Sequence, residues 1–457
     1  MAEWKPIDDL FDYEKGSLQS SKCTPGKYSF ITAAEEWKTH EKFTHDGEAL
    51  IFAMAASGSL GRTHYVNGKF ISSDLCFILT PKKGLRLDLT FYYRLFNFLR
   101  ADIVKKTATG TSKLAINQTN FGAYKLPFFD YEHQLIFRDK IEKINGISES
   151  FSLGLDDQLA LLKQLRQSVL QEAIEGKLTA EWRKKNHALI SGDNHASKLL
   201  EKIKAEKERL IKEGKIKKDK PPLSITNAEK AFELPEGWVW CRLGEIVDIV
   251  TKGSSPNWQG IQYVDKDKGI RFITSKNVGS YVIDLTDETF VDKHFNEIEP
   301  RSILEKGDIL TNIVGASIGR TAIYNMDDLA NINQAVCLIR YAHEFVIKMF
   351  FLHWMNSSWI IDKMHKDEFA PGRANLSMTN VSNFPFPLPP LVEQQTIVNL
   401  VEKLMVMIDE LEKQVTERKE QAEMLMQSVL REAFAEEKDN HEGVDLLILL
   451  LNAVKLD

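Results

Sequence analysis

The amino-acid sequence predicts a duplicated protein of the α/β (α+β) class, in which two mixed domains each precede one long helix. Three observations support this prediction: a heptad pattern that occurs twice, short motifs that recur in the same order ahead of it, and strand-like segments inside each half. With 457 residues, the chain is long enough for two or three domains with cores of their own.

The heptad pattern lies in segments 137–169 and 397–429. In the later segment, apolar residues alternate steps of four and three around one charged residue, and subtracting 260 from each position reproduces the phase in the earlier segment. The later positions are Ile397, Val401, Leu404, Ile408, Leu411, Val415, Arg418, Ala422, Leu425 and Val429, and the earlier ones are Phe137, Ile141, Ile144, Ser148, Phe151, Leu155, Gln158, Leu162, Leu165 and Val169. Two such helices are expected to bury their stripes against each other as an antiparallel coiled coil. The residues expected to pair the helices are Leu155, Leu162, Leu165, Val169, Val415, Leu425 and Val429.

Four shorter motifs recur ahead of the heptad segments, and their common order makes duplication the best explanation. The segments 4–12 and 240–248 share tryptophan, aliphatic, acidic and aspartate positions, and Ser59–Thr63 matches Ser317–Thr321 at an offset of 258. Gly110 and Leu114 match Gly372 and Leu376, and Glu132-x-Gln134 matches Glu393-x-Gln395.

Within each half, short apolar segments bounded by Gly, Asn or Ser predict strands at 49–55, 74–79, 271–274, 308–314 and 335–340. Segments 89–105 and 344–363 have helical spacing, and their aromatic residues are interpreted as core rather than as platforms that stack on bases. A further helix over 199–211 precedes a basic, proline-stopped segment, 215–222, for which a solvated hinge is favoured over phosphate contact. The expected boundaries are domains at 1–128 and 237–390, helical regions at 129–195 and 391–440, a helix with linker at 196–236 and a tail at 441–457.

Composition narrows the setting and the possible partners. The four cysteines lie far apart without a C-x-x-C pair, and no signal peptide or membrane-length apolar run is evident, so a reduced, cytoplasmic location without membrane contact is expected. The net charge of −6 argues mildly against nucleic acid. The acidic excess is concentrated in the last helix and the tail, however, so DNA binding is not excluded.

Catalytic signatures are missing from the sequence. It has no G-x-x-x-x-G-K-[ST] loop, no dinucleotide-type glycine motif and no G-x-S-x-G, and its 11 histidines are scattered without metal-ligand spacing. An adenine methyltransferase would need an Asn/Asp-Pro-Pro-aromatic loop, which Lys220-Pro221-Pro222-Leu223 does not provide. The chain is therefore expected to be neither an enzyme nor a holder of a metal or cofactor.

Polar residues at glycine turns, and in the short polar segment Thr274-Ser275-Lys276-Asn277, instead suit recognition of DNA. Arg can bond guanine O6 and N7 in a fork, and Asn can pair with adenine N6 and N7. The candidates are Arg62, Lys113, Lys276, Asn277, Arg320, Arg373 and Asn375. The alternative interpretation is that Gly61 and Gly319 only close hairpins and that Arg62 and Arg320 are solvated.

Several motifs resemble those of the specificity subunits of type I restriction-modification systems. They are Leu234-Pro235-Glu236-Gly237-Trp238 leading into Leu243-Gly244-Glu245-Ile246, Lys306-Gly307-Asp308-Ile309-Leu310, Glu206-Lys207-Glu208-Arg209-Leu210-Ile211, Pro387-Leu388-Pro389-Pro390-Leu391-Val392-Glu393-Gln394-Gln395, and Gln427-Ser428-Val429-Leu430 with its earlier copy. The resemblance spans nearly the whole chain. The first copy departs most, because segment 126–134 lacks the double proline and no Leu-Pro-x-Gly-Trp entry precedes it.

The resemblance implies two target-recognition domains, each reading one half of a split site in double-stranded DNA, held apart by two helical regions. It also implies partner subunits: modification subunits that methylate adenine with S-adenosylmethionine, and a restriction subunit that translocates DNA with ATP and Mg. None of these cofactors is expected to bind this chain. Two alternatives remain open: a coiled-coil scaffold that binds only protein, and an enzyme with an unrecognised methyltransferase or nuclease site.

Overall fold

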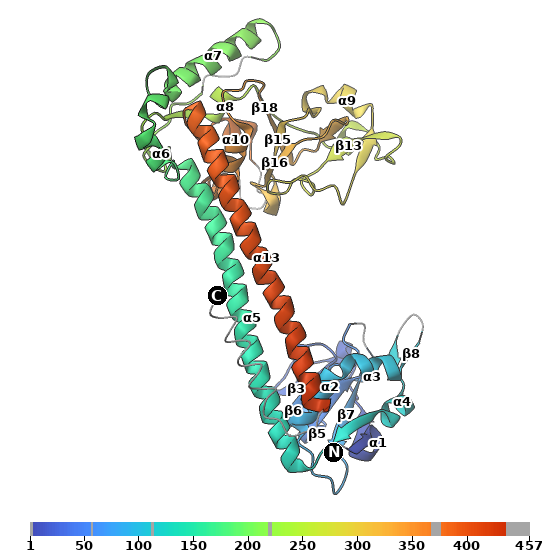
Figure 1. Ribbon diagram of the computed structural model, residues 1–457. Helices are drawn as coiled ribbons and strands as arrows, with labels where there is room; N and C mark the ends of the chain where they lie inside the picture. Colours follow the sequence, from blue (N-terminus) through green and yellow to red (C-terminus); the bar gives the residue numbers. More distant parts are fainter. Residues whose placement is uncertain (1–2, 56–57, 111–113, 218–221, 367–375, 436–457) are drawn as a thin grey trace. The chain divides into compact units, whose positions relative to one another are not determined.

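The computed structural model describes residues 3–55, 58–110, 114–217, 222–366 and 376–435, except for the side chains of 427 and 429–435. The chain divides into two compact units, of which unit 1 comprises residues 1–157 and 415–457 and unit 2 comprises residues 158–414 (Figure 1). The predicted tail, 441–457, and part of the basic linker, 218–221, lie outside the described residues. Each unit mixes helices with sheets, as the sequence predicts.

Unit 1 is built on a six-stranded sheet in the order β2-β7-β5-β6-β3-β4. Its strands and helices are β1 (Glu3–Pro6), α1 (Ile7–Leu10), β2 (Phe11–Lys15), β3 (Tyr28–Ile31), β4 (Lys38–His40), β5 (His45–Ala53), β6 (Thr63–Ser72), β7 (Cys76–Pro81), α2 (Leu89–Phe98), α3 (Arg100–Thr107), β8 (Ala108–Thr109), β9 (Ala115–Ile116), α4 (Gln118–Ala123) and β10 (Lys125–Phe128). Side chains alternate along a strand, so β5 buries Leu50 and Phe52 against α2, and Ala49 and Ile51 in a second core on the other face.

Unit 2 contains a four-stranded sheet in the order β12-β18-β15-β16, which matches the order β2-β7-β5-β6 of unit 1. A separate three-stranded sheet has the order β14-β13-β17. The elements are α6 (Ala180–Lys185), α7 (Ala196–Lys212), β11 (Val239–Arg242), α8 (Leu243–Ile246), β12 (Ile249–Lys252), β13 (Gly269–Ile273), β14 (Phe290–Asp292), α9 (Phe295–Ile298), β15 (Asp308–Asn312), β16 (Thr321–Tyr324), β17 (Ala330–Ile332), β18 (Val336–Arg340), α10 (Lys348–Met355), α11 (Ser358–Lys366), α12 (Met378–Ser382) and β19 (Pro385–Leu388). The predicted strands are therefore confirmed to within a few residues at their ends.

The two helices predicted at 89–105 and 344–363 are each broken into two. The side-chain amide of Asn97 donates to the carbonyl oxygens of Tyr93 (3.0 Å) and Thr63 (2.8 Å) where α2 ends. Asn356 does the same at the end of α10, with Leu352 (3.0 Å) and Thr321 (3.1 Å). An asparagine that bonds the backbone in this way competes with helix propagation, and here it also fastens the helix to a hairpin. The aromatic residues of these helices are core as predicted, since Phe91, Tyr92, Phe96, Phe350, Phe351 and Trp354 are fully buried.

Each domain is closed by one antiparallel strand pair next to its long helix. In unit 1, β1 pairs with β10 and places Trp4 opposite Pro127. In unit 2, β11 pairs with β19 and places Trp240 opposite Pro387. The tryptophans differ by 236 and the prolines by 260, which are the offsets of the sequence repeats.

Gln134 and Gln394 occupy the same environment at the starts of the long helices. Their amide nitrogens donate to the carbonyl oxygens of Phe129 (2.7 Å) and Pro389 (3.1 Å), and their amide oxygens accept from the backbone N–H groups of Asp88 and Ile347, both at 2.8 Å. Both glutamines are fully buried. The motif comparison that aligned Gln134 with Gln395 is therefore off by one residue, and the offset of 260 found in the heptads is the correct one.

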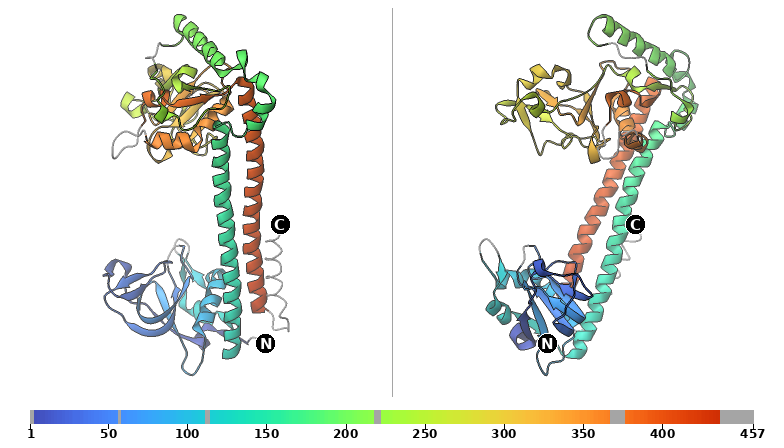
Figure 2. Two further views of the ribbon diagram at one scale, coloured as in Figure 1. Left: turned by 90° about the vertical axis from the view of Figure 1, so that its left-hand side faces the viewer. Right: turned by 180° about the vertical axis from the view of Figure 1, so that it is seen from behind.

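The long helices are α5 (Tyr131–Ile174) and α13 (Leu391–Ala435), and within each unit a part of one lies beside a part of the other (Figure 2). In unit 1, Ile144 packs with Leu425, and the Lys419 ammonium lies 2.7 Å from the Asp156 carboxylate. In unit 2, Arg166 pairs with Asp409 at 2.6 Å and Glu412 at 3.1 Å. The residue numbers rise along α5 as they fall along α13 from contact to contact in unit 1, so the helices run in opposite directions.

The predicted pairing residues differ in their burial. Leu155, Val169 and Val415 are buried, and Leu162 and Leu425 are half-buried and contribute to hydrophobic clusters. Leu165 is 46% exposed. The neighbouring Arg166 contacts α13 instead. The expectation that Leu165 pairs the helices is corrected accordingly. The side chain of Val429 lies outside the described residues.

A buried carboxylate joins two of the motifs that were singled out in the sequence. Glu393, which is fully buried, accepts hydrogen bonds from the Trp238 indole (2.8 Å), the Thr179 hydroxyl (2.6 Å) and the Arg183 guanidinium (2.5 Å). The Leu-Pro-Glu-Gly-Trp motif therefore anchors the start of α13.

Within the described part of the chain, no helix has the length and apolar character needed to cross a membrane.

Arg242 fastens the segment that enters the domain of unit 2. Its guanidinium is 3% exposed and binds the Glu229 carboxylate at 2.7 and 3.0 Å, as well as the carbonyl oxygens of Leu223 and Ser224. The hydrogen bonds from Arg242 lower the pKa of Glu229 from 4.5 to about 2. A carboxylate with a depressed pKa stabilises the folded state above its unfolded pKa, and this contribution is lost as the pH falls toward the folded pKa.

We therefore expect Glu229→Gln to lower the free energy of unfolding by about 2 kcal/mol at pH 7. The difference from the parent chain should shrink as the pH falls from 4.5 toward 2, because the parent carboxyl is then protonated as well. Urea denaturation at a series of pH values measures both effects. Glu181→Gln is the matched control, since the Glu181–Lys184 pair is about three-quarters exposed and should change the free energy by only a few tenths of a kcal/mol. A Glu229→Gln effect that does not vary with pH would contradict the assignment.

Candidate nucleic-acid interface

The same hairpin turn is present in both units at the predicted Gly-Arg motif. In unit 1, the Gly61 N–H donates to the Ala53 carbonyl (2.8 Å) and the Arg62 N–H to Ser59 (3.0 Å). In unit 2, Gly319 donates to Asn312 (3.0 Å) and Arg320 to Ser317 (3.3 Å). Both glycines have φ in the left-handed region, at 77° and 89°, where a residue with a Cβ is strained. The expectation that these glycines close hairpins is confirmed.

The two arginines of these turns have different surroundings. The Arg62 guanidinium is 24% exposed and donates to the Ala33 carbonyl (3.3 Å) and the Ser59 hydroxyl (3.4 Å), with Glu35 at 3.7 Å. Arg320 is exposed, and its side chain forms no hydrogen bond or ion pair with any described residue of the chain. Arg320 is therefore available to an external acceptor, whereas Arg62 is partly used within its own turn.

A second guanidinium, not predicted from the sequence, supports the turn of unit 1. Arg100 at the start of α3 donates to the carbonyl oxygens of Leu60 (2.8 Å) and Gly58 (2.9 Å). Burial, together with the positive charge of Arg62, lowers the pKa of Arg100. Two cations therefore flank one turn. No local sequence signal marks Arg100, because it lies about 40 residues from the turn and approaches it only through the fold.

Lys276 and Asn277 are adjacent but have different roles. Asn277 is 2% exposed, its amide nitrogen donates to the carbonyl oxygens of Asp284 and Asp287, and its oxygen accepts from Thr274. Its side chain is therefore occupied within its own loop and cannot pair with a base in this conformation, which corrects the expectation for Asn277. The Lys276 ammonium is 79% exposed, with Asp287 at 3.5 Å, and faces solvent.

The remaining candidates, Lys113, Arg373 and Asn375, lie outside the described residues. The chain that follows them is placed beside the first turn in both units. Ile116 donates to the Met54 carbonyl (2.8 Å), and Leu376 donates to the Ile313 carbonyl (3.0 Å). The tertiary structure thus brings the end of the second predicted turn to the strand that leads into the first.

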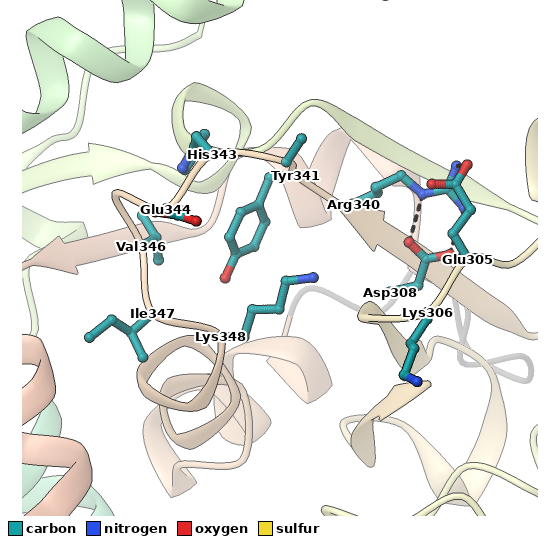
Figure 3. Close-up of a pocket in the computed structure, with 11 residues that line it drawn as sticks. Glu305, Lys306, Asp308, Arg340, Tyr341, His343, Glu344, Val346, Ile347 and Lys348 are labelled. Atoms are coloured by element: carbon teal, nitrogen blue, oxygen red, sulfur yellow. Dashed lines mark hydrogen bonds and ion pairs between the residues drawn. The ribbon is translucent and has the colours of Figure 1, made fainter. Parts of the chain in front are cut away.

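A pocket of about 550 Å³ in unit 2 carries several charged side chains (Figure 3). Arg340 pairs with Asp308 at 2.6 Å and with Glu305 at 2.7 Å, and the Lys348 ammonium donates to the Gly307 carbonyl at 2.6 Å. Burial lowers the pKa of Lys348. The guanidinium in this pocket is neutralised from within the chain, in contrast to that of Arg320.

The described residues contain no group of three His, Cys, Asp or Glu side chains that could hold a metal ion.

Comparison with known proteins assigns the chain to a family. The model of the type I restriction modification DNA specificity domain matches residues 1–141 and 235–421, which is more than half of the chain. The specificity subunit of the Escherichia coli type I restriction enzyme EcoDI is 25% identical, over 100% of this chain and 95% of that subunit. The EcoAI specificity subunit of Escherichia coli is 31% identical, over 57% of this chain but only 42% of its own length.

Among solved structures, one described as the structural basis of complex assembly and conformational transition of the type I R-M system is similar in fold. Its TM-score is 0.54 at 16% identity, and the match covers 95% of this chain and 98% of that chain. The identity is too low for more than a likeness of fold. On the match of the family model, together with the relatives, the chain belongs to the family of type I restriction-modification DNA specificity subunits.

Proposed function

We propose that this chain is the DNA-recognition subunit of a type I restriction-modification complex and that it reads a bipartite, gapped site in double-stranded DNA. The observation that carries the proposal is the recurrence of one hairpin turn that ends on an arginine in both units. Arginine suits both phosphate contact and bidentate recognition of guanine. Each unit would therefore read one half-site with equivalent, but not identical, side chains.

Duplication underlies the two-part site. The shared strand order, the Trp–Pro pairings of β1–β10 and β11–β19, and the matching Gln134 and Gln394 contacts support two copies of one domain-plus-helix design. The target-recognition domains would be residues 1–128 and 237–390. The antiparallel contacts in unit 1 and the Arg166 ion pairs in unit 2 support a coiled coil of α5 and α13 that joins them.

Catalysis would be supplied by partner subunits rather than by this chain. A modification subunit would methylate adenine using S-adenosylmethionine, and a restriction subunit would translocate and cut DNA using ATP and Mg. This chain would position both subunits on the site and would bind none of these cofactors itself. The location proposed for such a complex is the cytoplasm, where its DNA substrate lies.

Mapping of methylated adenines tests this function. The chain is purified alone and together with a type I modification subunit from the same genome, and both samples are incubated with S-adenosylmethionine and genomic DNA. We expect methylation only in the reconstituted sample, at a two-part site with a fixed gap. Methylation or cleavage by the chain alone would identify it as an enzyme. A reconstituted complex that neither binds nor methylates DNA specifically would favour a scaffold that binds only protein.

A further inference from the structure

The loop Ser275–Ile283 of unit 2 is held in an unusual conformation beside the Arg320 turn. Tyr281 has φ of 67° and is the one non-glycine residue with positive φ among those that the structure describes. The Gly279 N–H donates to the Val282 carbonyl (2.9 Å), and Val278 pairs with Ile283, so the segment forms a tight hairpin. A non-glycine residue remains in this region only when its surroundings enforce it.

Three contacts enforce the conformation. The Tyr281 N–H donates to the Thr321 carbonyl at 2.9 Å, which places Tyr281 against the residue that follows Arg320. The Tyr281 hydroxyl lies 3.0 Å from Nδ1 of His353, which is 3% exposed on α10. The amide of Asn312, which is fully buried on β15, donates to the carbonyl oxygens at Ser275 (2.9 Å) and Val278 (3.1 Å).

The loop also carries exposed side chains. Val282 is 57% exposed, and Lys276 is 79% exposed. Arg320 is exposed as well and directly precedes Thr321, to which Tyr281 is bonded, so the loop and the turn together offer two cations and one apolar group. This combination suits DNA, since Lys binds phosphate, Arg forks onto guanine, and an apolar side chain contacts the thymine methyl group.

Unit 1 has a different residue at the position of Asn312. Ala53 takes the place of Asn312, because the Ala53 N–H donates to the Arg62 carbonyl as the Asn312 N–H donates to that of Arg320. An alanine side chain cannot hold a neighbouring loop by hydrogen bonds. In unit 1 the turn arginine itself holds a neighbouring segment, because Arg62 donates to the Ala33 carbonyl. In unit 2 Asn312 does so and leaves Arg320 free of side-chain bonds to described residues, so the two half-sites would be chemically different.

We propose that the loop Ser275–Ile283 is a second segment of unit 2 that reads DNA bases, an inference that rests on the proposed function. Val282 determines specificity by contacting a thymine methyl group next to the base pair read by Arg320, and Lys276 binds a phosphate. Tyr281 and Asn312 are positioning residues that fix the loop against the Arg320 turn. The half-site of unit 2 should then contain an A·T pair beside the position that depends on Arg320.

The test measures methylation by the reconstituted complex on a DNA library in which both half-sites are randomised. Val282→Ala should reduce discrimination at one A·T position of the unit 2 half-site on the order of 5-fold. Tyr281→Ala should reduce discrimination at this position and at the Arg320-dependent position together, because alanine loses the ring while keeping the strain. Tyr281→Phe should reduce both less than alanine does, since it keeps the ring and loses only the hydroxyl contact with His353. The unit 1 half-site, present in the same molecules, should not change.

Leu223→Ala is the matched control, because Leu223 is a 68% exposed aliphatic residue of unit 2 outside this loop. It should leave both half-sites unchanged. If the parent complex recognises a bipartite site but Val282→Ala and Tyr281→Ala leave its sequence preference intact, the loop is not a reading element. If the parent complex recognises no such site, the proposed function itself fails. Loss of preference in both half-sites equally would indicate a general folding defect and would also overturn the assignment.

Discussion

Inserting one heptad into each long helix is expected to widen the gap between the two half-sites by about three base pairs. Seven residues lengthen a helix by roughly 10 Å at about 1.5 Å per residue. DNA rises about 3.4 Å per base pair. If the paired helices set the distance between the reading domains, the unread gap must follow their length. The half-site sequences should stay unchanged, because the reading loops are untouched.

The contacts between the helices decide where the two insertions belong. Arg166 pairs with Asp409 and Glu412 in unit 2, and Asp156 pairs with Lys419 in unit 1. Insertions after Leu162 and after Glu412 therefore lie at the same level of the helix pair. The sequence repeat would instead match Leu162 with Ala422, but equivalent residues of an antiparallel pair lie at different levels.

Sequencing of methylated sites from the double-insertion variant provides the measurement. The inserted residues should repeat the apolar pattern so that the seam continues. An insertion into α5 alone serves as the control, and it should lower stability and recognition because the seam residues beyond it lose their partners. An unchanged gap in a folded double-insertion complex, or altered half-site bases, would show that the helices do not set the spacing.

Arg320→Ala is expected to relax recognition at one position of the unit 2 half-site by about 1–3 kcal/mol, or about 5- to 150-fold. Arg320 is exposed and its side chain forms no bond to any described residue, so truncating it to alanine leaves the backbone bonds of the turn intact. Arg62→Ala should affect the unit 1 half-site alone. Its effect will include some loss of turn stability, because the guanidinium also holds the Ala33 carbonyl and the Ser59 hydroxyl.

A lysine substitution separates two ways in which Arg320 could act. Arg320→Lys keeps the charge but loses the planar fork, so it should behave like alanine if the residue reads guanine, and like the parent if it binds only phosphate. Arg301→Ala is the control, because Arg301 is 64% exposed but is paired with Glu299 within the chain. Competition binding with single-base variants of the site gives the discrimination directly. Equal binding preferences for the parent chain and Arg320→Ala would remove this residue from the recognition surface.

The sequence alone determined the elements whose signal is periodic or repeated. The heptad phase predicted both long helices, since a stripe of apolar residues every three or four positions has to be buried somewhere. Alternating apolar segments located the strands, and the 258-residue offset located the Gly-Arg turns. The positive φ at Gly61 and Gly319 explains why the turn requires glycine in both units.

Only the tertiary structure decided which side chains are free to act. Asn277 looked like a base reader, but hydrogen bonds to Asp284 and Asp287 occupy its amide. Arg62 and Arg320 share one motif, but the Arg62 side chain is bound by Ala33 and the Arg320 side chain by no described residue. Arg100 joined the site from a distant helix. The local sequence pattern predicts the conformation of the backbone. Whether a polar side chain is free to bind a ligand depends instead on neighbours that are remote in sequence, and the packing of the domain determines which neighbours these are.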